Sequence, residues 1–396
     1  MKLYAQHGYG SGEKILNGIE EEFIDGVIFS PRDIKRNKLR DRLEKYSDKN
    51  VDLLFDPQLY VSLFDDNPSL KKRHLSTWKY YKGYRKNFLE LSENIDLILK
   101  EYYKSISSLK LTSIIAPSIC ISKSFNSIEA VIAKNFIRRT SNVFKNTKDK
   151  RDVYASLVID WQAFLENEEF EAFLDDLTLI ENKPKGIYLV IGSDSLNPQD
   201  EFYISEVISG WMKLNYVLNL NGYKVINGYS DLLTPLLGAV GGYAGATGWW
   251  SNLRYFKMER FIPTSSGGRM PIVRYLSKLL FNRVTFSELD AISQILPKVY
   301  NDLSTDSYYD PEPESREQEM LQSWQTIRSL NQEFKKDNVS DSLKFITNFL
   351  RNSYLSYNEL KLNQIRLEKK SGEAHLINLR DAISSFATWA EIPLEN

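Results

Sequence analysis

The sequence predicts an α/β fold: a (β/α)8 TIM barrel with a helical insertion after strand 3 and a C-terminal helical region. Three observations predict this class. Eight short apolar runs occur along roughly the first 250 residues, helical patterns separate them, and longer helical patterns follow the last run. Runs that are apolar throughout and rich in Val, Ile, Leu and Tyr are typical of strands buried on both faces of a parallel sheet. Their alternation with helices indicates a closed barrel, with a doubly wound open sheet as the alternative.

Most of the predicted strands are apolar over four to six residues and end in polar or turn-forming residues. They are KLYAQHG (2–8), GVIFSPRD (26–33), VDLLFDPQ (51–58), TSIIAPSICIS (112–122), DVYASLVIDWQ (152–162), GIYLVIGSD (186–194), YKVINGYSD (223–231) and ATGWWSNL (246–253). Amphipathic stretches between them, such as EKILNGIEEEFI (13–24), place their apolar residues at helical spacing.

Two regions depart from this alternation. Residues from about 62 to 110 form an oversized insertion with helical patterns, and STDSYYDPEPES within about 303–316 is typical of an acidic, proline-bearing linker. We therefore predict a barrel over residues 1–285 and a helical region over 286–396. The helices expected beyond the linker are EMLQSWQTIRSLNQEF (319–334), SLKFITNFLRNSYLSYNEL (342–360) and AHLINLRDAISSFATWAEI (374–392).

The composition limits the classes of function. The 396 residues include 51 basic and 52 acidic ones, so no overall charge attracts the chain to nucleic acid or to an anionic membrane. The single cysteine, Cys120, excludes an internal disulfide and a multi-cysteine zinc site, and the three histidines are too scattered to form a metal cluster. We expect no cofactor, no metal, no membrane partner and a cytoplasmic location.

One basic stretch with interleaved aromatic residues lies in the insertion, KKRHLSTWKYYKGYRKNF (71–88). Such a pattern can follow phosphates and stack bases. It can also be an amphipathic helix in which Trp78, Tyr81 and Phe88 face the core. A third interpretation is a protein-docking surface, for which Trp78, Tyr81, Tyr84 and Arg85 are the candidates.

The segment NGYSDLLTPLLGAVGGYAGATGWWSNLRYF (227–256) joins a strand with a glycine turn, a helix and an aromatic strand, and no Asp or Glu occurs from Leu232 to Met258. This order resembles the closing part of the tRNA-guanine transglycosylase barrel. In that family the last strand carries two aspartates, one of which attacks the ribose and releases the base. The best match places Thr247 and Trp250 at those positions and Ser251 after them. The resemblance thus implies a barrel without the family nucleophile, because neither side chain can replace a carboxylate in that step.

Other fragments resemble the same family in the same order, over roughly residues 1–285. FDPQLY (55–60) falls where the family has an acid–base aspartate, which would be Asp56. SIC (118–120) falls where the family reads Asp-Glu-Cys, so Cys120 matches and Ser118 replaces a base-recognising aspartate. VIGSD (190–194) resembles the strand that approaches the base. The family's zinc-binding cysteines are absent, and the helices after residue 317 are candidates for stabilising that region instead.

The resemblance implies a surviving pocket for a guanine-like base at the carboxyl ends of the strands. Flat faces would come from Tyr229, Trp249 and Trp250, and hydrogen bonds from Asp56, Gln58, Ser118, Cys120, Asp160, Gln162, Gly192 and Ser193. Polar residues at strand ends can instead cap the following helices.

Within that family, the sequence is most similar in character to the transglycosylase-like ancillary proteins of type IV CBASS antiphage operons. That resemblance implies a barrel remodelled to bind a CD-NTase whose N-terminus carries a 7-deazaguanine. Two alternatives stay open: an active base-exchange enzyme acting on tRNA or DNA through Asp56 or Asp160, and an unrelated barrel enzyme with a small-molecule substrate. The family further implies a homodimer, while nucleic acid is the less favoured partner.

Overall fold

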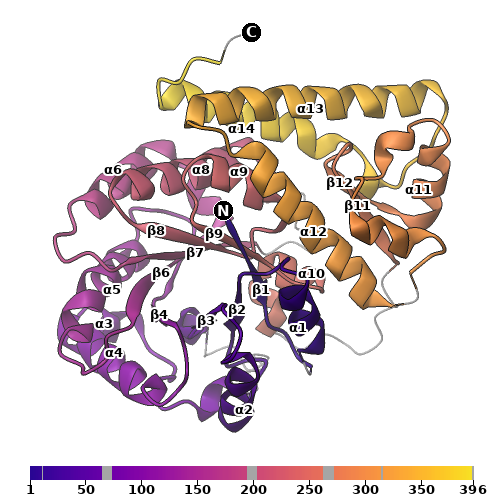
Figure 1. Cartoon of the computed structure of the whole chain (residues 1–396). Helices are drawn as coiled ribbons and strands as arrows, with labels where there is room; N and C mark the ends of the chain where they lie inside the picture. Colours follow the sequence, from indigo (N-terminus) through magenta and orange to yellow (C-terminus); the bar gives the residue numbers. More distant parts are fainter. Residues whose placement is uncertain (11, 65–73, 194–202, 262–271, 314, 395–396) are drawn as a thin grey trace.

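The computed structural model confirms the predicted fold class: mostly parallel strands form a nearly closed barrel, with helices around it and a helical C-terminal region (Figure 1). The structure describes residues 1–10, 12–64, 74–193, 203–261, 272–313 and 315–394. The barrel strands follow the order β3-β2-β1-β9-β8-β7-β6-β4. Their bounds are β1 Lys2–Gln6, β2 Gly26–Phe29, β3 Asp52–Phe55, β4 Ser113–Ala116, β6 Asp152–Asp160, β7 Gly186–Ser193, β8 Lys224–Gly228 and β9 Ala244–Thr247.

The barrel strands are buried on both faces, as their uninterrupted apolar runs predict. In β7, for example, all residues from Ile187 to Ile191 are buried. Two short strands extend the sheet at the carboxyl ends, because β5 Cys120–Ile121 pairs with β6 and β10 Phe256–Lys257 pairs with β7. The sheet therefore extends farther at this end of the barrel beside β6 and β7 than beside the other strands.

Between β3 and β4 the barrel is joined by individual hydrogen bonds rather than by a ladder of paired residues. The backbone N–H of Thr112 donates to the Leu53 carbonyl (2.9 Å), and the Thr112 hydroxyl accepts from the Leu53 N–H (2.8 Å). The hydroxyl of Tyr102 lies 2.6 Å from the Ile115 carbonyl oxygen and 3.5 Å from that of Phe55. Tyr102 belongs to a helix of the insertion, so the insertion supplies a side chain that bridges the two strand edges.

Helices cover the outside of the barrel. Their bounds are α1 Glu13–Glu20, α2 Arg36–Tyr46, α3 Lys86–Leu89, α4 Ser92–Ile106, α5 Ile128–Phe144, α6 Asn167–Thr178, α8 Ser205–Leu220, α9 Thr234–Ala239 and α10 Ser251–Arg254. α5 begins after Ser127, whose hydroxyl accepts from the Ala130 N–H, as expected for an N-cap.

The predicted strand 112–122 is divided in two. β4 ends at Ala116 and β5 begins at Cys120. Pro117 follows Ala116 directly, and because proline has no N–H it cannot donate a hydrogen bond that would continue the ladder.

The predicted strand 246–253 is wrong over its second half, where β9 has ended and α10 begins at Ser251. The chain turns at Gly248, and Leu253 folds back against it. A Cβ atom at Gly248 would lie 2.5 Å from the Cβ of Leu253, so only glycine permits this approach. The two tryptophans after Gly248 therefore lie beyond the strand.

The insertion between β3 and β4 contains two 3-10 helices, Leu59–Phe64 and Leu75–Thr77, followed by α3 and α4. Residues 65–73, which include the first three of the basic stretch, lie outside the described part of the chain.

The amphipathic-helix interpretation of 71–88 is wrong for the residues that the structure describes. Trp78 has an extended backbone (φ −88°, ψ 130°), and the next helix begins only at Lys86. Trp78 packs on Phe55 of β3, with ring centroids 4.8 Å apart, so packing on the barrel holds the segment in a non-helical path. Trp78 and Tyr81 are buried as that interpretation required, whereas Phe88 is exposed.

The C-terminal region contains the three predicted long helices as α12 Arg316–Phe334, α13 Val339–Leu362 and α14 Ala374–Trp389. Before them lie an antiparallel hairpin, β11 Arg274–Ser277 with β12 Asn282–Thr285, and α11 Phe286–Ser293. The hairpin is a sheet of its own, separate from the barrel sheet. Within 303–316, a 3-10 helix spans Ser304–Tyr309 with Thr305 and Tyr309 buried, and Glu314 lies outside the described residues.

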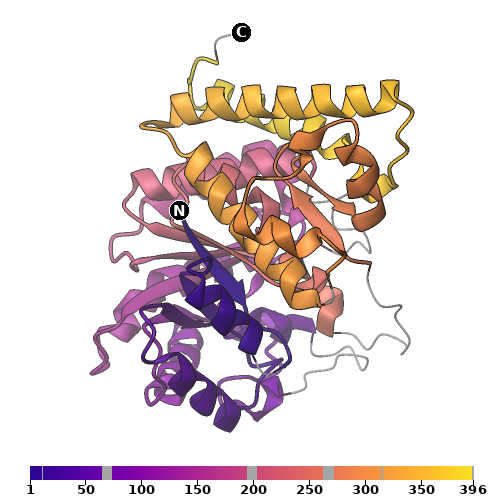
Figure 2. The same cartoon turned by 45° about the vertical axis from the view of Figure 1, so that its right-hand side comes forward.

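The C-terminal helices pack directly on the barrel. α12 lies against α9, and α14 lies against α8, while α13 runs along α14 (Figures 1 and 2). α8 is consequently buried on both faces, from Val207 to Asn215. Gln322 of α12 also hydrogen-bonds both backbone groups of Leu276 in β11 (3.0 and 2.9 Å).

Across the described ranges of the chain, no helix is both long and apolar enough to cross a membrane.

Candidate functional site

The polar residues at the carboxyl ends of the strands form three hydrogen-bonded groups, and we call this end of the barrel the mouth. Each group surrounds one buried carboxylate: Asp56 after β3, Asp33 after β2 and Asp231 after β8. Barrel enzymes bind their ligands at this end.

Asp56 is fully buried and is held by hydroxyl and amide groups. Its Oδ2 atom accepts from the Tyr60 hydroxyl (2.8 Å) and lies 3.5 Å from the Tyr188 hydroxyl, which accepts from Gln6 Nε2 (3.1 Å). Its Oδ1 atom accepts from the Gln58 N–H (3.0 Å). Burial raises the pKa of Asp56 to about 6, although the hydrogen bonds oppose the rise. A carboxyl group that titrates near neutral pH can donate or accept a proton.

Asp33 is paired with two arginines. Its Oδ2 atom lies 2.8 Å from Arg260 Nη2, and its Oδ1 atom lies 2.6 Å from Arg32 Nη1. Arg260 also donates to the Tyr229 hydroxyl (2.7 Å) and places its guanidinium over the Tyr229 ring. Although burial acts to raise it, the two guanidinium groups hold the pKa of Asp33 below its ordinary value.

Asp231 forms a bidentate ion pair with Arg283 of the C-terminal hairpin, with N–O distances of 2.7 and 3.0 Å. The hydroxyl of Thr247, the last residue of β9, donates to the same carboxylate (2.6 Å). Burial acts to raise the pKa of Asp231, but the guanidinium groups of Arg283 and Arg254 and the hydroxyl of Thr247 hold it below its ordinary value. Both oxygens of this carboxylate are thus occupied by protein donors.

Several buried polar atoms at the mouth have no hydrogen-bond partner among the described residues, among them both ring nitrogens of His7, Nε2 of Gln58 and Oγ of Ser118. Gln58 is 0% exposed and Ser118 is 1% exposed. Leaving a buried polar group unpaired costs about 1–3 kcal/mol, so Gln58 Nε2 and Ser118 Oγ are expected to bind a water or a ligand. Gln58 also has φ +53°, a region that non-glycine residues rarely adopt and that occurs more often at functional sites.

The remaining predicted hydrogen-bonding residues lie along the same rim. Cys120 is buried in β5, and Gly192 is buried in β7. Asp160 and Gln162 are half-buried, and Oδ1 of Asp160 accepts from the Gln162 N–H (2.9 Å) as the N-cap of a 3-10 helix. The side chain of Ser193 lies outside the described part of the chain.

The three predicted flat faces are arranged differently from one another. Tyr229 is buried, with one side covered by Arg260 and its ring tilted against Phe256, whose centroid is 5.3 Å away. Trp249 is half-buried with its ring edge-on to His7, and Trp250 is 42% exposed. Tyr229 therefore contributes its hydroxyl to the Arg260 group, and Trp250 lies at the surface.

Of the predicted partner-binding residues, the structure buries two and exposes one. Trp78 and Tyr81 are 2% and 6% exposed, whereas Tyr84 is half-buried and Arg85 is exposed. Trp78 packs on Phe55 of β3, and both buried residues also line a groove on the insertion.

Several residues of the mouth were not among the predicted site residues. Tyr188 lies inside an otherwise aliphatic strand, where a hydroxyl within such a run is a usable signal. Arg260 and Arg283 come from a 3-10 helix and a hairpin after the last barrel strand, and nothing in their local sequence connects them with the mouth. Tyr60 follows Asp56 by one turn, so its spacing could have suggested the contact.

Within the described ranges, no group of His, Cys, Asp and Glu side chains is arranged to hold a metal ion.

Comparisons with known proteins give distant structural likenesses. No protein-family model matches the chain, and no curated protein matches it. One similar solved structure is an HpcH/HpaI aldolase from Desulfitobacterium hafniense DCB-2, with 7% identity, a TM-score of 0.34 and coverage of 62% of this chain and 86% of that chain. Another is a GH3-family glycosyl hydrolase from Mycobacterium smegmatis str. MC2 155, with 9% identity, a TM-score of 0.37 and coverage of 62% and 83%. Likenesses this distant assign no function.

Replacing Asp56 by Asn is expected to remove a pH-dependent part of the stability. The carboxyl ionises near 3.8 in the unfolded chain but keeps its proton to about pH 6 in the folded protein. Between these values the folded state binds more protons, so the wild type loses stability as the pH rises. Relative to Asp56→Asn, its free energy of unfolding should fall by roughly 2 kcal/mol between about pH 4 and pH 7, measured by urea denaturation. A pH-independent difference between the two proteins would contradict the raised pKa.

Replacing Arg283 by Met is expected to lower the free energy of unfolding by about 3–5 kcal/mol, because Asp231 would be left as an unpaired buried charge. Chemical denaturation measures the loss. The double variant Arg283→Met/Asp231→Asn carries no such charge and should recover part of the stability. Equal stability of the single and double variants would show that the ion pair is not the cause.

Proposed function

We propose that the chain is a tRNA-guanine transglycosylase-like barrel that has lost the family nucleophile and binds a 7-deazaguanine-modified partner protein, a CD-NTase, in antiphage defence. On this proposal the barrel is a recognition module. Its mouth holds the modified base, and the surrounding surface contacts the partner.

The observation that carries the proposal is the environment of Thr247. It ends the last barrel strand, where the resemblance expects a nucleophilic carboxylate, and its hydroxyl donates to Asp231. Asp231 is the carboxylate of that group, and Arg283 binds both of its oxygens. A carboxylate held in a buried bidentate pair is stabilised in its ground state, so it is a poor nucleophile towards a sugar.

Unpartnered polar atoms support a ligand with hydrogen-bonding edges. Gln58 Nε2 can donate to a ring carbonyl, and Ser118 Oγ can donate or accept. The Asp56 carboxyl, partly protonated near neutral pH, can serve either kind of edge. A 7-deazaguanine presents a carbonyl, a ring N–H and an amino group, which suits this mixed set.

The proposal includes a cytoplasmic location, which a single cysteine supports because disulfides mark oxidising compartments. It also includes a homodimer, an expectation that comes from the family alone.

Thermal denaturation with 7-cyano-7-deazaguanine tests the base site. A ligand at about 100 times its Kd stabilises the folded state by about 2.7 kcal/mol, so the Tm should rise by a few degrees. Ser118→Ala should reduce the rise, because it removes the hydroxyl proposed to contact the base. Ser323→Ala is the matched control: its hydroxyl is likewise buried and without a partner among the described residues, but it lies on α12. No rise with the wild type, or equal loss in both variants, would contradict a base site at the mouth.

The alternative function, base exchange on tRNA or DNA, is favoured by one observation. Asp56 has no ion pair among the described residues, and its pKa of about 6 suits acid–base chemistry. If the chain is such an enzyme, tRNA incubated with labelled guanine should gain label, and Asp56→Asn should abolish the gain. Ligand binding without incorporation would favour the recognition module.

A further inference from the structure

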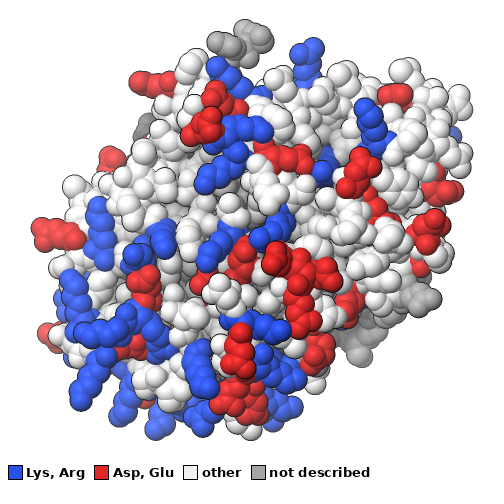
Figure 3. All heavy atoms as spheres, viewed as in Figure 1, with Lys and Arg blue, Asp and Glu red and all other residues white. Residues whose placement is uncertain are grey.

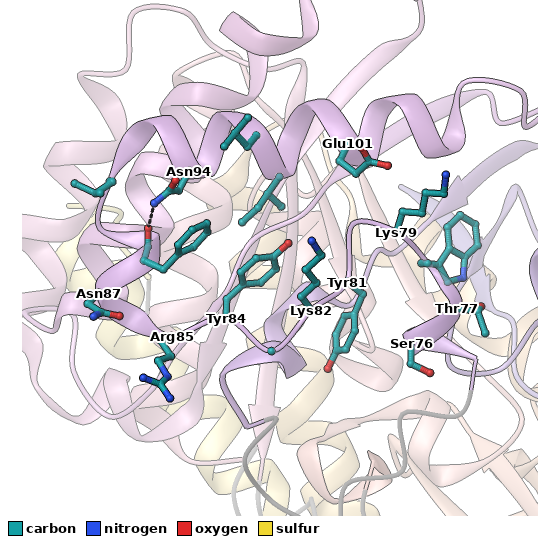
Figure 4. A pocket seen from close by; sticks show the side chains of 16 residues that line it. Ser76, Thr77, Lys79, Tyr81, Lys82, Tyr84, Arg85, Asn87, Asn94 and Glu101 are labelled. Atoms are coloured by element: carbon teal, nitrogen blue, oxygen red, sulfur yellow. Dashed lines mark hydrogen bonds between the residues drawn. The ribbon is translucent and has the colours of Figure 1, made fainter.

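A large groove lies on the insertion, away from the three carboxylate groups of the mouth. It encloses about 1220 Å³ between the segment 76–91 and α4, and we call it the α4 groove. In Figure 4, Lys79, Lys82 and Tyr84 extend toward α4, and Asn94 closes one end of the groove by donating to the Phe88 carbonyl (2.8 Å).

The cations of the α4 groove have no anionic partner among the described residues. Lys79, Lys82 and Arg85 all line the groove and are exposed, and none forms an ion pair there. Cations just outside it are paired, as Lys86 is with Glu129 and Arg139 with Asp96. The lining includes a single acidic residue, Glu101.

The groove lies in the most basic part of the molecule. Residues 71–151 contain 18 Lys and Arg but only 6 Asp and Glu, although the whole chain is close to neutral. Figure 3 shows Lys and Arg side chains gathered over the part of the surface where Figure 1 shows α2 to α5. The field over this surface therefore attracts an anionic partner.

The wall of the groove carries exposed apolar side chains. Leu91 and Leu97 are each 60% exposed, and Phe88 is 40% exposed. The rings of Tyr84 and Phe88 stack on one another, with centroids 5.6 Å apart and an angle of 17° between their planes. Exposed apolar groups rimmed by charges are typical of protein interaction sites.

We propose that the α4 groove binds an acidic peptide segment of a partner protein, with its carboxylates on Lys79, Lys82 and Arg85 and its large apolar side chains against Leu91, Leu97 and Phe88. The charges and the apolar wall together select this occupant. Single-stranded nucleic acid fits less well, because leucines offer no flat face to a base and Tyr84 and Phe88 cover one face of each other. This docking surface is independent of the base site at the mouth.

Selection from a random peptide library displayed on phage tests the proposal. The full chain should enrich peptides that combine Asp or Glu with Leu, Phe or Trp. The double variant Lys79→Glu/Lys82→Glu should bind the selected peptides at least about tenfold more weakly, and Leu97→Ser should bind them several-fold more weakly. The double variant Lys148→Glu/Lys150→Glu is the matched control, since both lysines are exposed, lie on the basic surface outside the groove and change the net charge equally.

Two results would overturn the proposal. One is enrichment of peptides without acidic residues, or equal binding by the two charge-reversal variants, which would leave only general electrostatic attraction. The other is a poly(dT) oligonucleotide that binds the wild type and displaces the selected peptides, when only the variant Lys79→Glu/Lys82→Glu, and not the control variant, binds the oligonucleotide more weakly. Neither measurement uses a deazaguanine, so failure here is separate from failure of the base site.

Discussion

A carboxylate buried at the mouth of a barrel must be matched by a cation or must keep its proton, because desolvation disfavours the unpaired charge. Among the residues that the structure describes, two of the three carboxylates at this mouth are matched by a cation and one is not. Asp33 and Asp231 are matched by Arg260 and Arg283, whereas Asp56 has hydrogen bonds but no cation among the described residues. The arginines come from elements that follow the last barrel strand, so the C-terminal part of the chain completes the mouth electrostatically as well as by packing.

This division sets what each carboxylate can do. The paired carboxylates of Asp33 and Asp231 hold neighbouring side chains in place, and arginines of the protein neutralise their charge. Asp56, whose pKa burial raises to about 6, can exchange a proton near neutral pH, and it lies on the same rim as the unpartnered groups of Gln58 and Ser118. The region suited to a ligand is therefore the β3 and β4 side of the mouth, rather than the β8 and β9 side where the family resemblance expects the nucleophile.

The fold could be predicted from the sequence because strands buried on both faces leave uninterrupted apolar runs, and the long C-terminal helices have clear periodicity. Local errors have local causes: Pro117 divides one run, and the approach of Leu253 to Gly248 ends another. The site was harder to predict because its partners are remote in sequence. Gln58 and Asp56 could be proposed from the end of one strand, but Arg283 lies 52 residues from Asp231. The hairpin that carries it has no pattern that points to the barrel. Trp78 and Tyr81 show a different limit, since the sequence pattern does not reveal that both side chains are mostly buried while they also line the α4 groove.

Because Tyr102 bridges β3 and β4, the insertion helps to close the barrel. A ring of strands has no free edges, and edges are what lead sheets to pair with other chains. The ring here is completed at its least connected point by a side chain from the inserted segment. The inserted segment is therefore a structural part of the ring, and a shorter relative of this protein would need another way to shield those two strands from intermolecular pairing.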